Sequence, residues 1–146
     1  MIRDYKVYRD IDGKQGSGYI EILPGNFEGK WWNPESLFIL EDEFAVVGAV
    51  IGFRVPEYDH YNTCTTIDAH ACWAVIRDLE ALAGALAPTA SVADWERLPA
   101  FKQSNYVLRF ADLEENKLAF RQMIEELVAW LRETMAYNRS IAVLGV

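Results

Sequence analysis

Residues 65–86 read TTIDAHACWAVIRDLEALAGAL, and this stretch carries the clearest secondary-structure signal in the chain. Two hydroxyl residues, Thr65 and Thr66, precede the acid Asp68, which is the pattern of a helix N-terminus. At about 100° per residue, one apolar stripe then forms from Cys72, Val75, Ile76, Leu79, Leu82, Ala83 and Leu86. The stretch therefore predicts an amphipathic helix over 67–86 that ends before Pro88.

A second amphipathic helix is predicted toward the C-terminus, with Asp112 as its cap and Glu114 and Glu115 beside its N-terminal dipole. Its apolar stripe consists of Phe120, Ile124, Leu127, Val128, Leu131 and Met135. Apolar stretches at 105–110 and 141–146 flank it and are typical of strands. Strand, helix and strand in this order allow a right-handed βαβ unit, and we expect the last strand to insert into the sheet.

The first half of the chain has the composition of β-structure. Short strands are predicted at 5–8 and 19–23, with glycine-rich turn residues between them. Two apolar runs, 37–40 and 44–55, then enclose three acids and predict an antiparallel hairpin buried on both faces.

Two features of this predicted hairpin bear on function. Its tip would be Glu41-Asp42-Glu43, a charged and solvated turn. At a period of two residues, Gly48 and Gly52 would share one face of the second strand and leave a shallow trough there. Close packing of a helix would fill such a trough, and a ligand or partner backbone is the alternative occupant.

Together these elements predict an α+β fold in which a mostly antiparallel sheet packs against two long amphipathic helices. The chain has 146 residues, which suits a single domain spanning 1–146. With 51% hydrophobic and 13% aromatic residues, the chain can form a substantial core without metals or disulfides.

The charge of the chain excludes some classes of partner. There are 14 Lys and Arg against 22 Asp and Glu, which gives a formal net charge of −8. Nucleic-acid phosphates and anionic membrane surfaces both require a basic footprint, so neither is an expected partner. The N-terminal residues lack the apolar core of a secretory signal, and the longest apolar run, 44–53, is too short to span a bilayer. We therefore expect a cytoplasmic protein.

Both histidines and both cysteines lie within residues 60–72, so a metal site has to be considered. The order His60-x3-Cys64-x5-His70-x-Cys72 lacks the paired short knuckles of a zinc site. On a helix, His70 and Cys72 would also be about 200° apart and could not converge on one ion. No common nucleotide-binding or hydrolase motif occurs either, so we expect neither a metal nor a cofactor.

A cysteine-dependent hydrolase is the alternative enzymatic hypothesis. Cys64 would precede the N-terminus of the predicted 67–86 helix, which lowers a thiol pKa, and His60 or His70 would serve as the base. No glycine-rich oxyanion element flanks Cys64. A free Cys72 in the apolar stripe would behave as a small hydrophobe.

Aromatic residues beside acids and turn residues form the strongest unexplained pattern. Aromatic anchors with a charged rim are typical of protein interfaces. The alternative for each single ring is that it folds inward and caps a small second core. The predicted partner-binding residues are Trp31, Trp32, Glu41, Asp42, Glu43, Glu57, Tyr58, Asp59, His60, Tyr61, Trp73 and Arg77.

These features predict a small acidic binding protein that docks on a basic protein partner. In size and charge the chain is similar to bacterial toxin immunity proteins, which neutralise a toxin by covering its active site. A structural or oligomerisation module that forms a homodimer is a further hypothesis.

Overall fold

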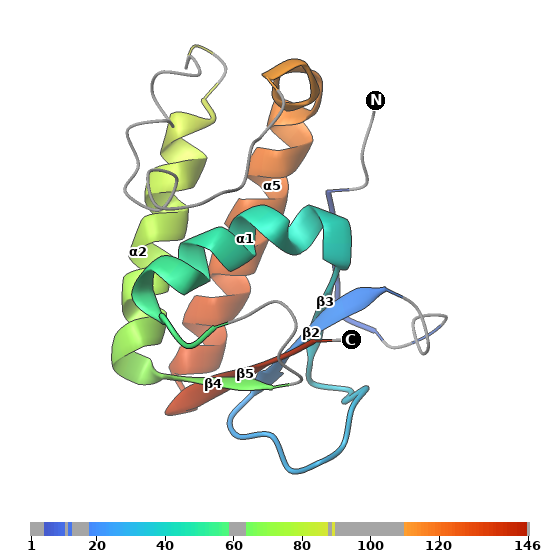
Figure 1. Ribbon diagram of the computed structural model, residues 1–146, viewed down its shortest axis with the longest axis vertical. Helices are drawn as coiled ribbons and strands as arrows, with labels where there is room; N and C mark the ends of the chain where they lie inside the picture. The colour runs from blue at the N-terminus through green and yellow to red at the C-terminus, as the bar shows by residue number, and fades with distance from the viewer. Residues whose placement is uncertain are drawn as a thin grey trace.

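Five strands form one antiparallel sheet in the order β1-β3-β2-β5-β4 (Figure 1). The computed structural model describes residues 5–10, 12, 18–58, 64–87, 89 and 110–145. Within these residues the strands are β1 (Val7–Tyr8), β2 (Tyr19–Pro24), β3 (Leu37–Leu40), β4 (Thr65–Asp68) and β5 (Ser140–Leu144). The predicted antiparallel sheet is confirmed, and the strands predicted at 5–8, 19–23 and 141–146 correspond to β1, β2 and β5.

Three helices of the described chain cover one face of this sheet, namely α1 (Glu41–Arg54), α2 (Ala69–Ala85) and α5 (Phe110–Met135) (Figure 1). The two long amphipathic helices predicted from the sequence are α2 and α5, which lie side by side. The result is the predicted single compact α+β fold. Within the described part of the chain, no helix combines the length and the apolar character that crossing a membrane requires.

Helix α2 begins two residues later than predicted because Thr65–Asp68 forms the edge strand β4. The Asp68 carboxylate caps the helix by accepting a hydrogen bond from the backbone N–H of Ala71 at 2.8 Å. Every member of the predicted apolar stripe is buried, from Cys72 to Leu86. The helix prediction is therefore correct in kind, and its N-terminal boundary is corrected.

The hairpin predicted over 37–55 is wrong. Strand β3 ends at Leu40, and residues 41–54 form helix α1 instead of a second strand. The buried residues of α1 recur at helical spacing and are Glu43, Phe44, Val46, Val47, Val50 and Ile51. An apolar run rich in β-branched residues does not distinguish a strand from a buried helix, and the 14-residue length of α1 favours the helix.

The trough predicted from Gly48 and Gly52 is wrong for the same reason, since both glycines lie on α1. A Cβ added at Gly48 would meet the Tyr58 ring at 3.3 Å, whereas one added at Gly52 would meet nothing within 4 Å. Gly48 thus lets the Tyr58 ring approach the helix closely, and it leaves no site for a ligand.

At the C-terminal end, β5 inserts between β2 and β4, as expected for an apolar strand. Both neighbours are antiparallel to β5, so it forms no parallel βαβ pairing with either of them. Of the strand predicted at 105–110, residues 105–109 lie outside the described residues, and Phe110 begins α5. Asp112 therefore lies within the helix and is not its N-cap.

The two faces of the sheet have different coverings. Alternate residues such as Ile20, Ile22 and Ile39 join the helices in the main core. The opposite face, called the outer face below, carries Glu21, Leu23, Phe38, Ala142 and Leu144. All five of these residues are buried, so the outer face is also covered.

Candidate partner-binding surface

Residues 25–36, called the Trp31 segment below, connect β2 to β3 and cover the outer face of the sheet. The Trp32 ring stacks on Phe38 with a centroid distance of 5.7 Å and an interplanar angle of 14°. Phe27 packs against Leu23, Ala142 and Leu144, and it also meets the Trp31 ring edge-on at 4.7 Å. The segment is therefore attached to the sheet by aromatic contacts along its length.

A buried carboxylate, that of Glu21 on β2, organises the Trp31 segment. Its side chain is 2% exposed. One oxygen, Oε1, accepts a hydrogen bond from the backbone N–H of Trp32 at 2.7 Å. The other, Oε2, accepts from the backbone N–H of Asn33 at 3.0 Å, the Asn33 amide at 2.9 Å and the Ser36 hydroxyl at 2.5 Å. Four donors thus compensate the buried charge, as a buried ion requires.

The backbone at Trp32 adopts a left-handed conformation, with φ of 64°. Among the described residues other than glycine, Trp32 alone has a positive φ. This conformation disfavours residues with a Cβ, and it persists where surrounding contacts enforce it. At Trp32 those contacts are the hydrogen bond to Glu21 and the stack on Phe38.

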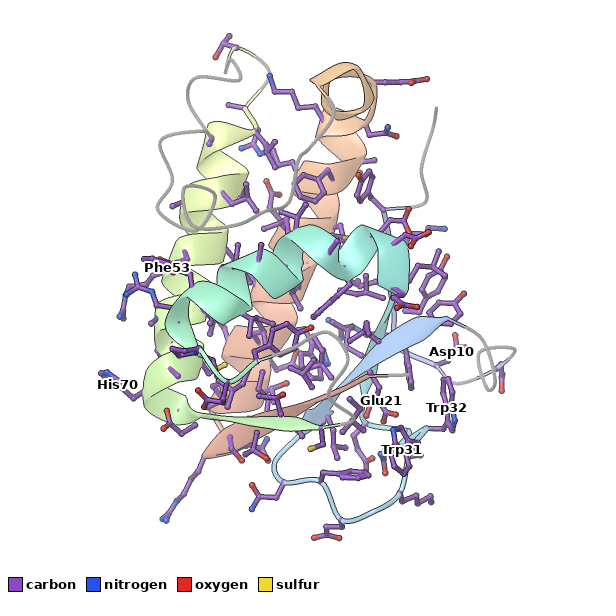
Figure 2. The ribbon with its side chains drawn as sticks, in the orientation of Figure 1. Asp10, Glu21, Trp31, Trp32, Phe53 and His70 are labelled. Carbon is purple, nitrogen blue, oxygen red and sulfur yellow. The ribbon has the colours of Figure 1, made fainter. Side chains whose placement is uncertain are left out.

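Trp31 is the exposed aromatic of the segment, with 40% of its surface accessible, whereas Trp32 is half-buried. Figure 2 shows both rings near Glu21, on the side of the sheet away from the helices. The exposed side chains of Glu28, Lys30 and Glu35 belong to the same segment. A large apolar ring with a charged rim is therefore presented on a fixed backbone.

A pocket of about 770 Å³ opens beside the Trp31 segment. Its lining consists of Leu23, Pro24, Gly25, Asn26, Glu28, Lys30, Asn33, Glu35 and Asn138. The Asn33 amide nitrogen donates to Glu21 and to the Lys30 carbonyl, and that of Asn138 donates to the Thr134 carbonyl. With their nitrogens engaged in these bonds, the two amides contribute acceptor oxygens to a lining that also holds the carboxylates of Glu28 and Glu35.

The three acids predicted as a hairpin tip have a different role in the structure. Glu41, Asp42 and Glu43 form the first turn of α1, where their negative charges interact favourably with the positive end of the helix dipole. No side chain caps this helix N-terminus. Asp42 is exposed, but Glu43 is buried at 7% exposure. They follow the end of β3 opposite to Ser36, and so lie a strand length from the Trp31 segment.

Of the predicted partner-binding residues at 57–61, only Glu57 and Tyr58 are among the described residues. Asp59, His60 and Tyr61 lie outside the described residues. Glu57 is exposed just after α1. Tyr58 is half-buried against the main core, with its ring next to Gly48 on α1, so it belongs to the helical side of the sheet.

Trp73 and Arg77 both lie on α2. Trp73 is half-buried against the main core, and the Arg132 guanidinium of α5 lies 5.7 Å from its ring centroid. Arg132 also pairs with Glu80 of α2. Trp73 therefore contributes to the packing of α2 on α5, on the opposite side of the sheet from Trp31. Arg77 is exposed.

The geometry does not favour an activated thiol. Cys64 precedes strand β4 and not a helix, so the helix N-terminus predicted next to it is wrong. Cys64 packs against the apolar cluster of Leu23, Ala142 and Leu144. Burial, with a smaller contribution from the Asp68 charge, raises the pKa of Cys72 to about 12. Both cysteines are free thiols. In the described part of the chain, no three His, Cys, Asp or Glu residues are placed to hold a metal ion.

Sequence reasoning missed the residues that organise the surface, namely Glu21, Phe27, Asn33 and Ser36. An acid within the apolar stretch Ile20–Leu23 was the available signal, because a strand buried on both faces has to pair such a charge. Asn33, which precedes Pro34, and Ser36 are turn residues whose polar groups act as donors to Glu21.

Comparison of the chain with protein-family models, with curated proteins and with solved structures gives no match.

Proposed function

We propose that this chain is a small acidic binding protein that docks on a basic protein partner through Trp31 and the segment around it. The observation that carries the proposal is the combination of an exposed Trp31 ring with a backbone fixed by buried Glu21. Rigid aromatic anchors bind with a small loss of conformational entropy, which is why they dominate many interfaces.

The charge distribution supports a basic partner. The chain has a formal net charge of −8, which attracts cationic proteins and accelerates their association. Beside Trp31, the pocket offers the carboxylates of Glu28 and Glu35 and the amide oxygens of Asn33 and Asn138. Lysine and arginine side chains are the donors that suit such a lining. Lys30, which also lines the pocket, offsets part of the negative charge of the two carboxylates.

Occlusion is the mode of action that we propose. A toxin with a basic active site would be neutralised when this acidic surface covers that site, as an immunity protein does. The two free thiols support a reducing compartment, so we propose that the protein acts in the cytoplasm.

The twelve partner-binding residues predicted from the sequence do not form one surface as a set. We retain Trp31, supported by Trp32, as the proposed anchor.

Site-specific photo-crosslinking tests this proposal. The probe is p-benzoylphenylalanine incorporated at position 31, and the matched control carries it at Leu118, an apolar residue of α5 that is 65% exposed. Crosslinking in the source cells, followed by mass spectrometry, should identify a basic protein at position 31 that is absent at position 118. The product of the neighbouring gene is the first candidate to examine.

Calorimetry with the identified protein completes the test. Trp31→Ala should weaken its binding by about 30-fold, the effect of losing an interface hot spot, and Leu118→Ala should not. An inhibitory role further requires that wild-type protein abolish the partner's activity or toxicity. Equal binding by the wild type and Trp31→Ala, or an acidic partner, would contradict the proposal.

A further inference from the structure

We propose that Glu21 is a positioning residue for the partner-binding surface, which holds Trp31 in its docking orientation without touching the partner. This inference rests on the proposed function, because it assigns to Glu21 a role in the affinity of the Trp31 surface. Glu21 is 2% exposed and therefore inaccessible to a partner.

The position of Glu21 makes it a firm attachment point. It lies on β2, which is paired on both sides: Glu21 is opposite Phe38 of β3 and Leu144 of β5. Two of its four donors are consecutive backbone N–H groups, those of Trp32 and Asn33. The peptide unit that follows Trp31 is therefore bound directly to the sheet, and the direction of the Trp31 side chain depends on it.

The hydrogen-bond pattern requires a carboxylate and not an amide. All four groups that contact Glu21 are donors, and three of them converge on Oε2. A glutamine would have one acceptor oxygen and one NH2 group. If its oxygen keeps the three donors of Oε2, its NH2 faces the N–H of Trp32. Glu21→Gln therefore breaks the bond nearest to Trp31, while side-chain size stays nearly constant.

Loss of this one bond has a specific consequence at Trp32. The left-handed backbone there, with φ of 64°, is unfavourable without an enforcing contact. When the N–H of Trp32 loses its acceptor, the segment can relax to other conformations, and Trp31 samples several orientations. A partner must then reorder the segment on binding, which lowers the affinity.

Hydrogen exchange of the free protein is the first measurement. In Glu21→Gln, the hydrogen-bonded amides of Trp32, Asn33 and Ser36 should exchange at least tenfold faster than in wild type. The amides of α2 and α5 that exchange by global unfolding should change only as much as the overall stability does. The matched control is Glu126→Gln on the exposed face of α5, which should leave the exchange of 31–36 unchanged. Unchanged exchange in Glu21→Gln would overturn the proposal.

Affinity for the protein crosslinked at position 31 is the second measurement. Glu21→Gln should weaken binding by about tenfold, and it should add little further loss in a Trp31→Ala background because both changes act on the same anchor. Faster exchange with unchanged affinity, or an equal loss in both backgrounds, would overturn the positioning role. Failure of Trp31→Ala to weaken binding would instead overturn the proposed function, and the exchange result would still decide whether Glu21 holds the segment.

A milder variant keeps the test usable if Glu21→Gln does not fold. Ser36→Ala removes one donor from Oε2 and leaves the carboxylate and the Trp32 bond in place. It should raise the exchange of residues 31–36 by a few-fold and weaken binding less than Glu21→Gln. No change in either quantity would count against the proposal.

Discussion

Trp32 stacks on Phe38 at a centroid distance of 5.7 Å although its backbone has a φ of 64°, in the left-handed region. Both features belong to Trp32, in the segment that covers the outer face. The stack of its ring is favourable, whereas the conformation of its backbone is unfavourable. Substitutions at position 32 that remove the ring can therefore measure the cost of the backbone conformation alone.

Glycine should be tolerated better than alanine at position 32. Both substitutions lose the stack on Phe38, but only glycine adopts a positive φ without steric cost. We expect Trp32→Gly to be more stable than Trp32→Ala by about 1 kcal/mol, which reverses the usual order of the two residues. Urea denaturation of both variants measures the difference, and an alanine variant of equal or higher stability would contradict it.

Removal of the α2 cap should lower stability measurably. The Asp68 carboxylate accepts from the N–H of Ala71 at 2.8 Å, so Asp68→Ala leaves that N–H without its side-chain acceptor. The expected loss is about 1 kcal/mol of unfolding free energy. Asp68→Ser and Asp68→Asn, which retain a capping oxygen, should recover most of it. Equal losses in all three variants would show that the cap is not the cause.

The glycines of α1 should respond differently to alanine. At Gly52 an added Cβ would have nothing within 4 Å, and we expect Gly52→Ala to raise the unfolding free energy by about 0.5–1 kcal/mol through helix propensity. At Gly48 the Cβ would lie 3.3 Å from the Tyr58 ring, so Gly48→Ala should gain less or lose stability. Thermal denaturation compares the two, and a larger gain at Gly48 would refute the packing described for Tyr58.

Cys72 should be unreactive in the native protein and should make stability depend on alkaline pH. Its pKa is raised from 9.0 to about 12, so the unfolded thiol ionises while the native thiol stays protonated. The native state then binds more protons than the unfolded state, and this contribution to stability is lost as pH rises from about 9 to about 12.

The Cys72 prediction is checked by two measurements. Unfolding free energies determined between pH 8 and pH 11 should fall more steeply in the wild type than in Cys72→Ala, which lacks the thiol. Alkylation at pH 8 followed by mass spectrometry should modify Cys72 only at the rate of global unfolding. Parallel pH profiles, or rapid native labelling of Cys72, would show that the thiol is not protected by burial.

The sequence predicted those parts of the fold in which side-chain periodicity is unambiguous. The stripe from Cys72 to Leu86 has polar residues opposite it, and strand β5 is too short and apolar to be anything but a buried strand. Helix α1 was predicted wrongly as a strand. Its sides away from the core carry Ala45, Gly48, Ala49 and Gly52, small residues that do not mark a solvent-facing side. Without a polar stripe opposite the apolar residues, the helical period cannot be recognised in the sequence.

The candidate surface was predicted only in part, for a different physical reason. Trp31 stands out in the sequence as an aromatic among turn residues, but the sequence does not decide whether such a ring points outward, as Trp31 does, or inward, as Trp32 does. The role of Trp31 in binding stays a prediction. Its support comes from Glu21, ten residues earlier, through contacts that depend on how residues 25–36 fold back over the sheet. Such a tertiary contact leaves no periodic signal along the chain.

The place of β5 in the sheet also has a consequence for biosynthesis. Ile22 of β2 is paired with Val143, and Ile67 of β4 with Ile141. Among the described strands, β2 and β4 are therefore joined only through β5, which the ribosome makes after both. Until residue 144 has emerged from the ribosome, β2 has an unpaired edge and β4 has no partner. The nascent chain therefore completes its sheet late, and until then these edges are open to pairing with other chains.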